Sequence, residues 1–126
     1  MIKVGDKIPS ATFMEKQEAG PAPVTSDELF KGKGISEIVC VSVNDAFVME
    51  AWGKDQKADG KVHMLADGNG DFTRALGLEF DASKFGMGKR SQRYSMIVDD
   101  GVVTSLNVEE PGAYEVSSAD HMLGLL

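Results

Sequence analysis

The chain has 126 residues, of which 42% are hydrophobic, and it carries 13 basic and 20 acidic side chains. This length predicts one compact domain over residues 1–126, and the apolar fraction excludes wholesale disorder. The net charge of −7 argues against a nucleic-acid binder, because phosphate backbones are bound by basic surfaces. The single cysteine excludes an internal disulfide and every zinc or dithiol motif that needs paired cysteines.

The apolar pattern predicts a soluble chain with no membrane contact. Residues 1–10 contain no apolar core of a secretory signal, and the apolar run at residues 38–41 is far shorter than the ~20 residues that span a bilayer. We therefore expect a cytoplasmic protein. His63 and His121 have no ligand partners at metal-binding spacing, so we expect no metal and no cofactor.

Glycine and proline punctuate the first 34 residues, which predicts turns around short extended pieces. Residues 25–30 have the pattern of a capped helical turn, with Thr25 or Ser26 as the N-cap and acidic residues in the first turn. Residues 37–43 are a near-continuous apolar and β-branched run. Such a run predicts a strand that is covered on both faces.

A helix is predicted over residues 46–57, with Asn44 or Asp45 as its N-cap, because apolar residues recur there at helical spacing. The large side chains on this helix fit either the core or a contact between two copies. We expect Phe47 in the core and leave both interpretations open for Trp52.

A short strand over residues 61–66 and a helix over 71–76, ended by Gly77, are predicted next. Residues 82–92 form a glycine-rich basic segment, which predicts a loop. Arg90 in this segment is expected to be a solvated charge.

Two further strands, within residues 93–108, are predicted to form a hairpin turned by Asp100 and Gly101, a dipeptide typical of primed turns. Ser117 or Ser118 is expected to cap a last helix. The order of strand, helix, strand, helix, hairpin and helix predicts an α/β fold and matches the second half of a thioredoxin-like domain.

Nearly the whole chain resembles one family, the type II (atypical two-cysteine) peroxiredoxins. The motifs that carry the resemblance are residues 4–9, 29–33, 40–52, 65–70, 75–78, 90–96, 98–103 and 106–109. The resemblance implies a thioredoxin-like peroxiredoxin domain. It also implies thiol-dependent reduction of hydrogen peroxide and organic hydroperoxides, with glutathione, glutaredoxin or thioredoxin as reductant, and a homodimer.

One family element is missing from this sequence. In the family, the Leu-Phe-x-Gly-Lys segment leads into a central strand, a loop with the peroxidatic cysteine, and a helix. Here Lys33 is followed directly by residues 34–36, so we expect a deletion near residues 33–35 that removes a strand–loop–helix crossover of a dozen or more residues.

The resemblance implies that Arg93 matches the active-site arginine of the family. Its guanidinium is suited to holding a thiolate and a peroxide oxygen together by hydrogen bonds. Cys40 does not match the peroxidatic cysteine, because Glu37 and Lys33 stand where that motif has a hydroxyl residue and a proline. The position of Cys40 matches a second cysteine proposed in some members as a resolving thiol. Taken by its surroundings alone, Cys40 is an inert thiol buried in a strand.

Three interpretations follow from these residues. The first is a peroxiredoxin whose active-site segment is missing from this sequence although the protein has it. The second is a true deletion that leaves a catalytically dead variant acting as an interaction or regulatory subunit. The third is an unrelated small α/β binding module. If this chain is complete, the resemblance implies that it is inactive as a peroxidase.

Overall fold

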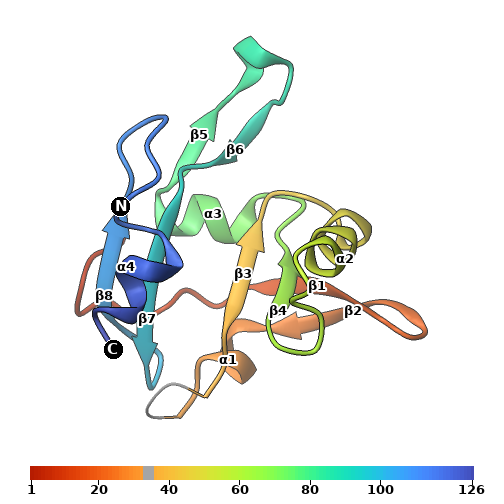
Figure 1. Cartoon of the computed structure of the whole chain (residues 1–126), viewed down its shortest axis with the longest axis horizontal. Coiled ribbons are helices and arrows are strands. Elements are labelled where there is room, and N and C mark those ends of the chain that lie inside the picture. Colours follow the sequence, from red (N-terminus) through yellow and green to blue (C-terminus); the bar gives the residue numbers. More distant parts are fainter. Residues whose placement is uncertain (33–35) are drawn as a thin grey trace.

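The computed structural model describes residues 1–32 and 36–126 (Figure 1). The deletion predicted near residues 33–35 lies outside these ranges. In chain order the elements are β1 (Thr12–Gln17), β2 (Gly20–Thr25), α1 (Ser26–Leu29), β3 (Val39–Ser42), α2 (Ala46–Asp55), β4 (His63–Ala66), α3 (Asp71–Leu76), β5 (Glu79–Asp81), η1 (Ser83–Phe85), β6 (Lys89–Ser91), β7 (Tyr94–Asp99), β8 (Val102–Val108) and α4 (Ala119–Leu123).

The strands of the described residues form three separate sheets. The largest has the order β2-β1-β4-β3, in which β1 is antiparallel to β2 and β4, and β3 is parallel to β4. The other two sheets are the antiparallel pairs β5–β6 and β7–β8. The β3 strand is therefore an edge of the largest sheet, and β7 is an edge of its own pair.

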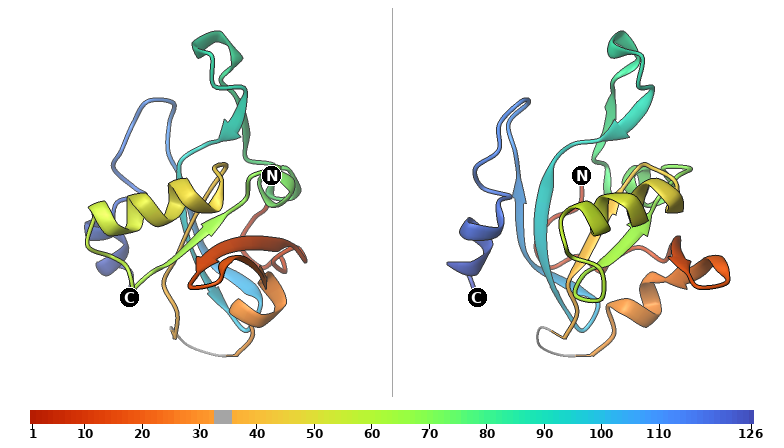
Figure 2. Two further views of the ribbon diagram at one scale, coloured as in Figure 1. Left: turned by 90° about the vertical axis from the view of Figure 1, so that its right-hand side faces the viewer. Right: turned by 45° about the vertical axis from the view of Figure 1, so that its right-hand side comes forward.

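Helix α2 lies across one face of the four-stranded sheet (Figure 2). Met49 of α2 is fully buried there with Ala46 and Ala66, and Cys40 and Met64 pack against this small cluster. The other face of the sheet covers the main apolar core, which it shares with α3 and the β7–β8 pair. The fully buried members of that core include Phe13, Leu65, Leu76, Leu78 and Val103.

The local signals at the helix ends are confirmed. Thr25 caps α1 by accepting a hydrogen bond from the Glu28 N–H, and Asp45 caps α2 by accepting one from the Val48 N–H. Ser118 caps α4 in the same way. Each cap uses a side-chain oxygen to satisfy an N–H that has no partner inside its helix.

The hairpin signal is also confirmed, because both Asp100 and Gly101 have positive φ angles, 52° and 78°. A primed turn requires this conformation at both central positions, and its twist suits the flanking strands. The β7 and β8 strands therefore form the predicted hairpin.

One prediction about burial is wrong. Phe47 is 59% exposed, because α2 turns Ala46, Met49 and Gly53 toward the sheet and leaves the Phe47 side facing outward. Both faces of β3 are packed as predicted, because Val39 and Val41 lie against the main core and Cys40 lies against the cluster under α2, although each residue of the strand is only half-buried. Trp52 lies on the exposed side of α2, with 43% of its surface accessible.

The prediction of a loop over residues 82–92 is wrong in part. The segment contains η1 and β6, and β6 pairs with β5 to form an arm that projects from the body of the molecule (Figure 1). Strand pairing with Glu79–Asp81 orders the basic residues at the end of this segment. The exposed side chains at the tip include Phe85 and Met87.

His63 links three parts of the largest sheet through its two ring nitrogens. Its Nδ1 lies 2.8 Å from Glu15 Oε2 on β1, and its Nε2 lies 2.9 Å from Glu37 Oε2, just before β3. Burial opposes the charged ring, but the two carboxylates outweigh it and raise the pKa of His63 above its ordinary value of 6.5. Since both carboxylates accept hydrogen bonds, the imidazolium with two N–H donors fits this arrangement.

The two contacts of His63 with Glu15 and Glu37 predict a loss of folding stability with rising pH. A raised pKa in the folded state contributes stability that is fully present below pH 6.5 and is lost as the pH rises through the raised value. We expect a contribution of about 1 kcal/mol or less, because the side chains are partly exposed and water screens them. Urea unfolding at a series of pH values measures it.

The control is the chain's second histidine. His63→Gln should flatten this part of the pH profile, whereas His121→Gln, on the exposed side of α4, should leave it unchanged. Equal pH profiles for the wild type and His63→Gln would contradict a protonated His63 held between Glu15 and Glu37.

Gly77 sets the close approach of α3 to the N-terminus. Its φ is 73°, and a Cβ there would lie 2.8 Å from Met1 Cα. We expect Gly77→Ala to lower the free energy of unfolding by about 2–3 kcal/mol, from backbone strain plus displacement of the N-terminal segment. Gly86 is the matched control, because its φ is 74° and nothing lies within 4 Å. Gly86→Ala should cost about 1–2 kcal/mol, and equal losses in thermal unfolding would refute the contact at Gly77.

Candidate functional site

Cys40 is the second residue of β3 and lies opposite Met64 of β4. The side chain is half-buried under α2, where it packs against the cluster of Ala46 and Met49. Burial raises the pKa of the Cys40 thiol above its ordinary value of 9.0. A thiol in this environment stays protonated at neutral pH and is a poor nucleophile.

Arg93 immediately precedes β7, and its side chain is exposed. Its guanidinium carbon lies 4.8 Å from the centre of the Tyr114 ring, which is a cation–π contact. Its backbone carbonyl accepts a hydrogen bond from the Glu109 N–H at 2.9 Å. The planar cation is therefore in contact with an aromatic ring from the loop that follows β8.

Cys40 lies in the largest sheet and Arg93 lies just before β7, and no hydrogen bond, ion pair or ring contact joins them within the described ranges. Tyr94 lies near both residues, because it follows Arg93 in the chain and is close enough to Cys40 for the two groups to interact electrostatically. Burial, together with the nearby charges of Asp67 and Cys40, raises the pKa of the Tyr94 hydroxyl. Tyr94 therefore lies on the side of β7 that faces β3, next to the arginine in the chain.

Glu109 holds the loop that carries Tyr114. The Glu109 carboxylate is nearly fully buried and accepts hydrogen bonds from the N–H groups of Glu115 at 2.6 Å and Ser117 at 2.9 Å, and from the Ser117 hydroxyl at 2.6 Å. Burial opposes its charge, but these hydrogen bonds lower the pKa of Glu109. Sequence reasoning missed Glu109 and Tyr114 as neighbours of Arg93. The signal was an acidic residue at a strand end, followed by turn residues and serines.

The prediction that Arg90 is a solvated charge is wrong. Its guanidinium donates to the carbonyl of Val43 and to Asn44 Oδ1, both at 2.8 Å, and to the carbonyl of Met87 at 2.9 Å. The pairing of β5 with β6 brings Arg90 to the carboxyl end of β3. Arg90 is thus a structural link between the projecting arm and the four-stranded sheet.

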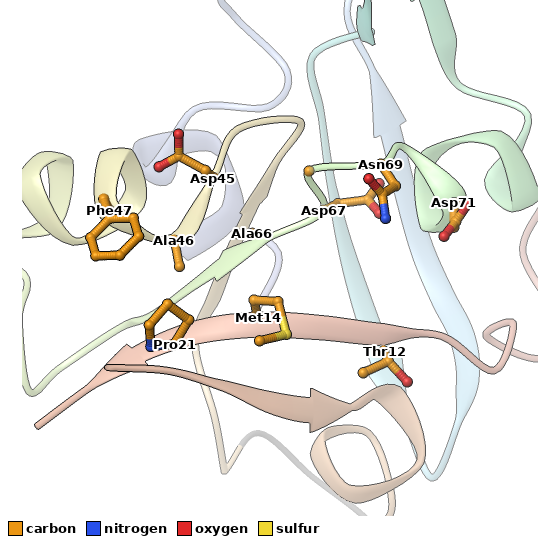
Figure 3. Close-up of a pocket in the computed structure, with 11 residues that line it drawn as sticks. Thr12, Met14, Pro21, Asp45, Ala46, Phe47, Ala66, Asp67, Asn69 and Asp71 are labelled. Carbon is orange, nitrogen blue, oxygen red and sulfur yellow. The ribbon is translucent and has the colours of Figure 1, made fainter. Parts of the chain in front are cut away.

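A cavity of about 270 Å³ lies between β1, the start of α2 and the start of α3 (Figure 3). Its acidic side chains have structural partners. Asp45 caps α2, and Asp67 accepts hydrogen bonds from the Phe72 and Thr73 N–H groups and from the Thr73 hydroxyl. Neither Cys40 nor Arg93 lines this cavity, so the cavity is separate from the predicted site residues.

Within the described ranges, no group of three or more histidine, cysteine or acidic side chains is arranged to hold a metal ion. No helix in the same ranges is long and apolar enough to cross a membrane.

Known proteins match this chain over most of its length. The Redoxin family profile matches residues 24–123. Peroxiredoxin-2E, chloroplastic, of Arabidopsis thaliana is 50% identical over 112 residues, which cover 87% of this chain and 48% of that protein. Peroxiredoxin-2E-2, chloroplastic, of Oryza sativa subsp. japonica is 54% identical over 163 residues, which cover 99% of this chain and 72% of that protein.

The match to the rice protein is longer than this chain. It runs over 163 positions, whereas the chain has 126 residues, so at least 163 minus 126, or 37, of the positions have no residue here. The chain spans about half the length of the Arabidopsis relative.

A solved structure gives the same result for the fold. The crystal structure of reduced Prx3 in complex with hydrogen peroxide from Vibrio vulnificus is 42% identical, with a TM-score of 0.92, and the match covers 99% of each chain. The thioredoxin-like α/β fold is thereby confirmed, and the interpretation as an unrelated binding module is excluded. On these matches, the chain belongs to the Redoxin family and, within it, to the peroxiredoxins.

Proposed function

We propose that this protein is a type II peroxiredoxin whose family chemistry is the thiol-dependent reduction of hydrogen peroxide and organic hydroperoxides. The observation that carries the proposal is the match to the hydrogen peroxide complex of the Vibrio vulnificus protein, together with an arginine at position 93. The reductant would be glutathione, glutaredoxin or thioredoxin. We further propose that the chain of 126 residues lacks the peroxidatic cysteine.

The chemistry explains why the missing cysteine decides activity. A thiolate attacks one oxygen of the hydroperoxide, the O–O bond breaks, and the cysteine becomes a sulfenic acid while the other oxygen leaves as water or an alcohol. A second thiol then reduces the sulfenic acid. The first step needs a thiolate stabilised by positive charge. Burial keeps the Cys40 thiol protonated, and no hydrogen bond or ion pair joins it to Arg93 among the described residues.

Two observations support a missing crossover near residues 33–35. At least 37 positions of the match to the rice protein have no residue in this chain. In addition, β3 and β7 each lack a strand on one side within the described ranges. A crossover with one strand fits both observations, because it would supply both a partner for these edges and the absent positions. An omitted stretch and a true deletion explain them equally well.

The roles of the remaining site residues follow from the family assignment. Arg93 would hold a thiolate and a peroxide oxygen, as its position in the family motif implies. Cys40 would serve, at most, as a resolving thiol. We also propose a cytoplasmic homodimer that acts in redox homeostasis, although the Arabidopsis relative is described as chloroplastic.

One observation favours a second function, that of an inactive interaction or regulatory subunit. Helix α2 exposes Phe47, Val48 and Trp52 along one side. Exposed apolar side chains that lie together are typical of a surface that contacts another protein.

Peroxide consumption and intact mass distinguish these interpretations. For a protein whose mass is 13.5 kDa, we expect no turnover above the rate of a Cys40→Ser control with any of the three reductants. If the active-site stretch is present in the protein, the mass will be higher and turnover will be measurable.

The result that would overturn the inactive form is turnover at 13.5 kDa that Cys40→Ser abolishes. That outcome would make Cys40 the attacking thiol. Turnover that persists in Cys40→Ser would instead indicate a contaminating peroxidase, and the assay would be repeated after further purification.

A further inference from the structure

The last helix, α4, is linked to the β7–β8 pair through the sulfur of Met122. Its Sδ lies 2.9 Å from the Ser95 hydroxyl oxygen and 3.6 Å from Asn107 Nδ2, and both groups donate to it. Ser95 and Asn107 are directly opposite each other in the antiparallel register, so their side chains lie on the same face of the pair. Figure 1 shows α4 beside these two strands. Two donors, one from each strand, therefore converge on one thioether.

This arrangement directs good hydrogen-bond donors at a weak acceptor. A thioether sulfur accepts hydrogen bonds only weakly. The Ser95 hydroxyl also lies 3.4 Å from the Val116 carbonyl, which is a stronger acceptor, yet it is closer to the sulfur. Oxidation of a methionine adds a polar oxygen to its sulfur, and this oxygen accepts hydrogen bonds better than the sulfur does. The two donors are therefore better matched to an oxidised methionine than to a reduced one.

Met122 is within reach of a small oxidant. The residue is half-buried, and α4 has no buried residue. Because methionine has three rotatable bonds, its sulfur can withdraw far enough to admit an oxygen beside the two donors. Within residues 1–32 and 36–126, no other methionine sulfur accepts a hydrogen bond. Met87, which is 49% exposed, and Met49, which is fully buried, are therefore an open and a closed reference in the same chain.

We propose that Met122 is a methionine-oxidation site at which Ser95 and Asn107 bind the oxygen of the sulfoxide. The oxidant is a hydroperoxide, the substrate class of the proposed function. The Met122 sulfur attacks the terminal oxygen of the hydroperoxide, so that an S–O bond forms while the O–O bond breaks. The sulfur gives up two electrons, and the proton of the attacked oxygen passes to the departing oxygen, which leaves as water or an alcohol.

This site does not depend on the missing crossover. Ser95 and Asn107 belong to the ladder between β7 and β8, whereas the strand proposed near residues 33–35 would pair with the other edge of β7. No cysteine takes part in the oxidation, so both an active peroxidase and an inactive chain would carry the site. The test supplies hydrogen peroxide directly, and the failure of either proposal leaves the other in place.

The test treats the folded chain with hydrogen peroxide and locates each sulfoxide by mass spectrometry of proteolytic peptides. A sulfoxide has two epimers, and each of the two classes of methionine sulfoxide reductase reduces only one of them, so treating the peptides with each class gives the epimer ratio. We expect one epimer of Met122 in about tenfold excess or more, because two hydrogen bonds favour it. Met87 should give both epimers in similar amounts, and Met49 should stay reduced.

Variants of the donors show whether the hydrogen bonds cause this excess. Ser95→Ala and Asn107→Ala should each lower the epimer ratio of Met122 by about threefold or more, since each removes one donor. Ser95→Thr keeps the hydroxyl and should keep the ratio. Ser105→Ala is the matched control, because Ser105 lies on the same face of β8 as Asn107, and within the described ranges no hydrogen bond joins it to Met122.

Thermal unfolding provides a second measurement. Sulfoxide formation in a packed region normally disrupts the packing. If the two donors bind the sulfoxide oxygen, oxidation should lower the Tm of the wild type by no more than it lowers the Tm of Met122→Leu, which carries every other sulfoxide. A clearly larger loss in the wild type would mean that the oxygen at Met122 has no such partners.

Three results for the epimers would overturn the proposal. Equal amounts of both epimers at Met122 would show that nothing in the fold binds the oxygen. An unchanged ratio in both alanine variants would assign the selectivity to access alone. A reduced Met122 at a peroxide concentration that fully oxidises Met87 would exclude the site. If an alanine variant does not fold, Asn107→Asp replaces it, because it keeps the size of the side chain and exchanges the donor for an acceptor, which should lower the ratio in the same way.

Discussion

Within the described ranges, side-chain packing and not strand pairing joins the largest sheet to the β7–β8 pair, and the rest of the structure depends on it. Phe13 of β1 meets the ring of Phe72 of α3 edge-on, with ring centres 4.8 Å apart. Leu65 of β4 and Val103 of β8 are fully buried in the same cluster. Because apolar packing is not directional, it holds the two sheets together without fixing a hydrogen-bonded register between them. Backbone hydrogen bonds from the segment before β1 to Gly101 and Val103 add to this packing, and both contribute to the relative position of Cys40 and Arg93.

The features that the sequence predicts well are those decided within a few residues. The turn at Asp100 and Gly101 needs positive φ at both positions, and few dipeptides adopt that conformation readily. Gly77 ends α3 for the same reason. The caps Asp45 and Ser118 satisfy N–H groups three residues away, so their function does not depend on distant parts of the chain.

The features that the sequence predicts poorly depend on residues far away in the chain. Apolar spacing predicts a helix at α2 but not which side of it meets the sheet, so the prediction that Phe47 lies in the core is wrong. The apolar run at β3 suits a central strand, and it is an edge because nothing in the described ranges pairs with its second side. Arg90 finds its acceptors 46 and 47 positions earlier, which no local pattern could indicate. The family resemblance identified Arg93, but not the Tyr114 ring beside it.

The N-termini of α2 and α3 are each occupied by a carboxylate of the chain itself. The parallel strands β3 and β4 lead into α2 and α3, and a helix N-terminus after such a strand is where an anion is stabilised. Here the carboxylate of Asp45 occupies the start of α2, and that of Asp67 occupies the start of α3. A second anion at either position would be repelled. Peroxide chemistry therefore needs a helix N-terminus that α2 and α3 do not offer, and within the described ranges β3 and β7 each pair with a strand on one side only. The strand–helix unit proposed near residues 33–35 would satisfy both requirements.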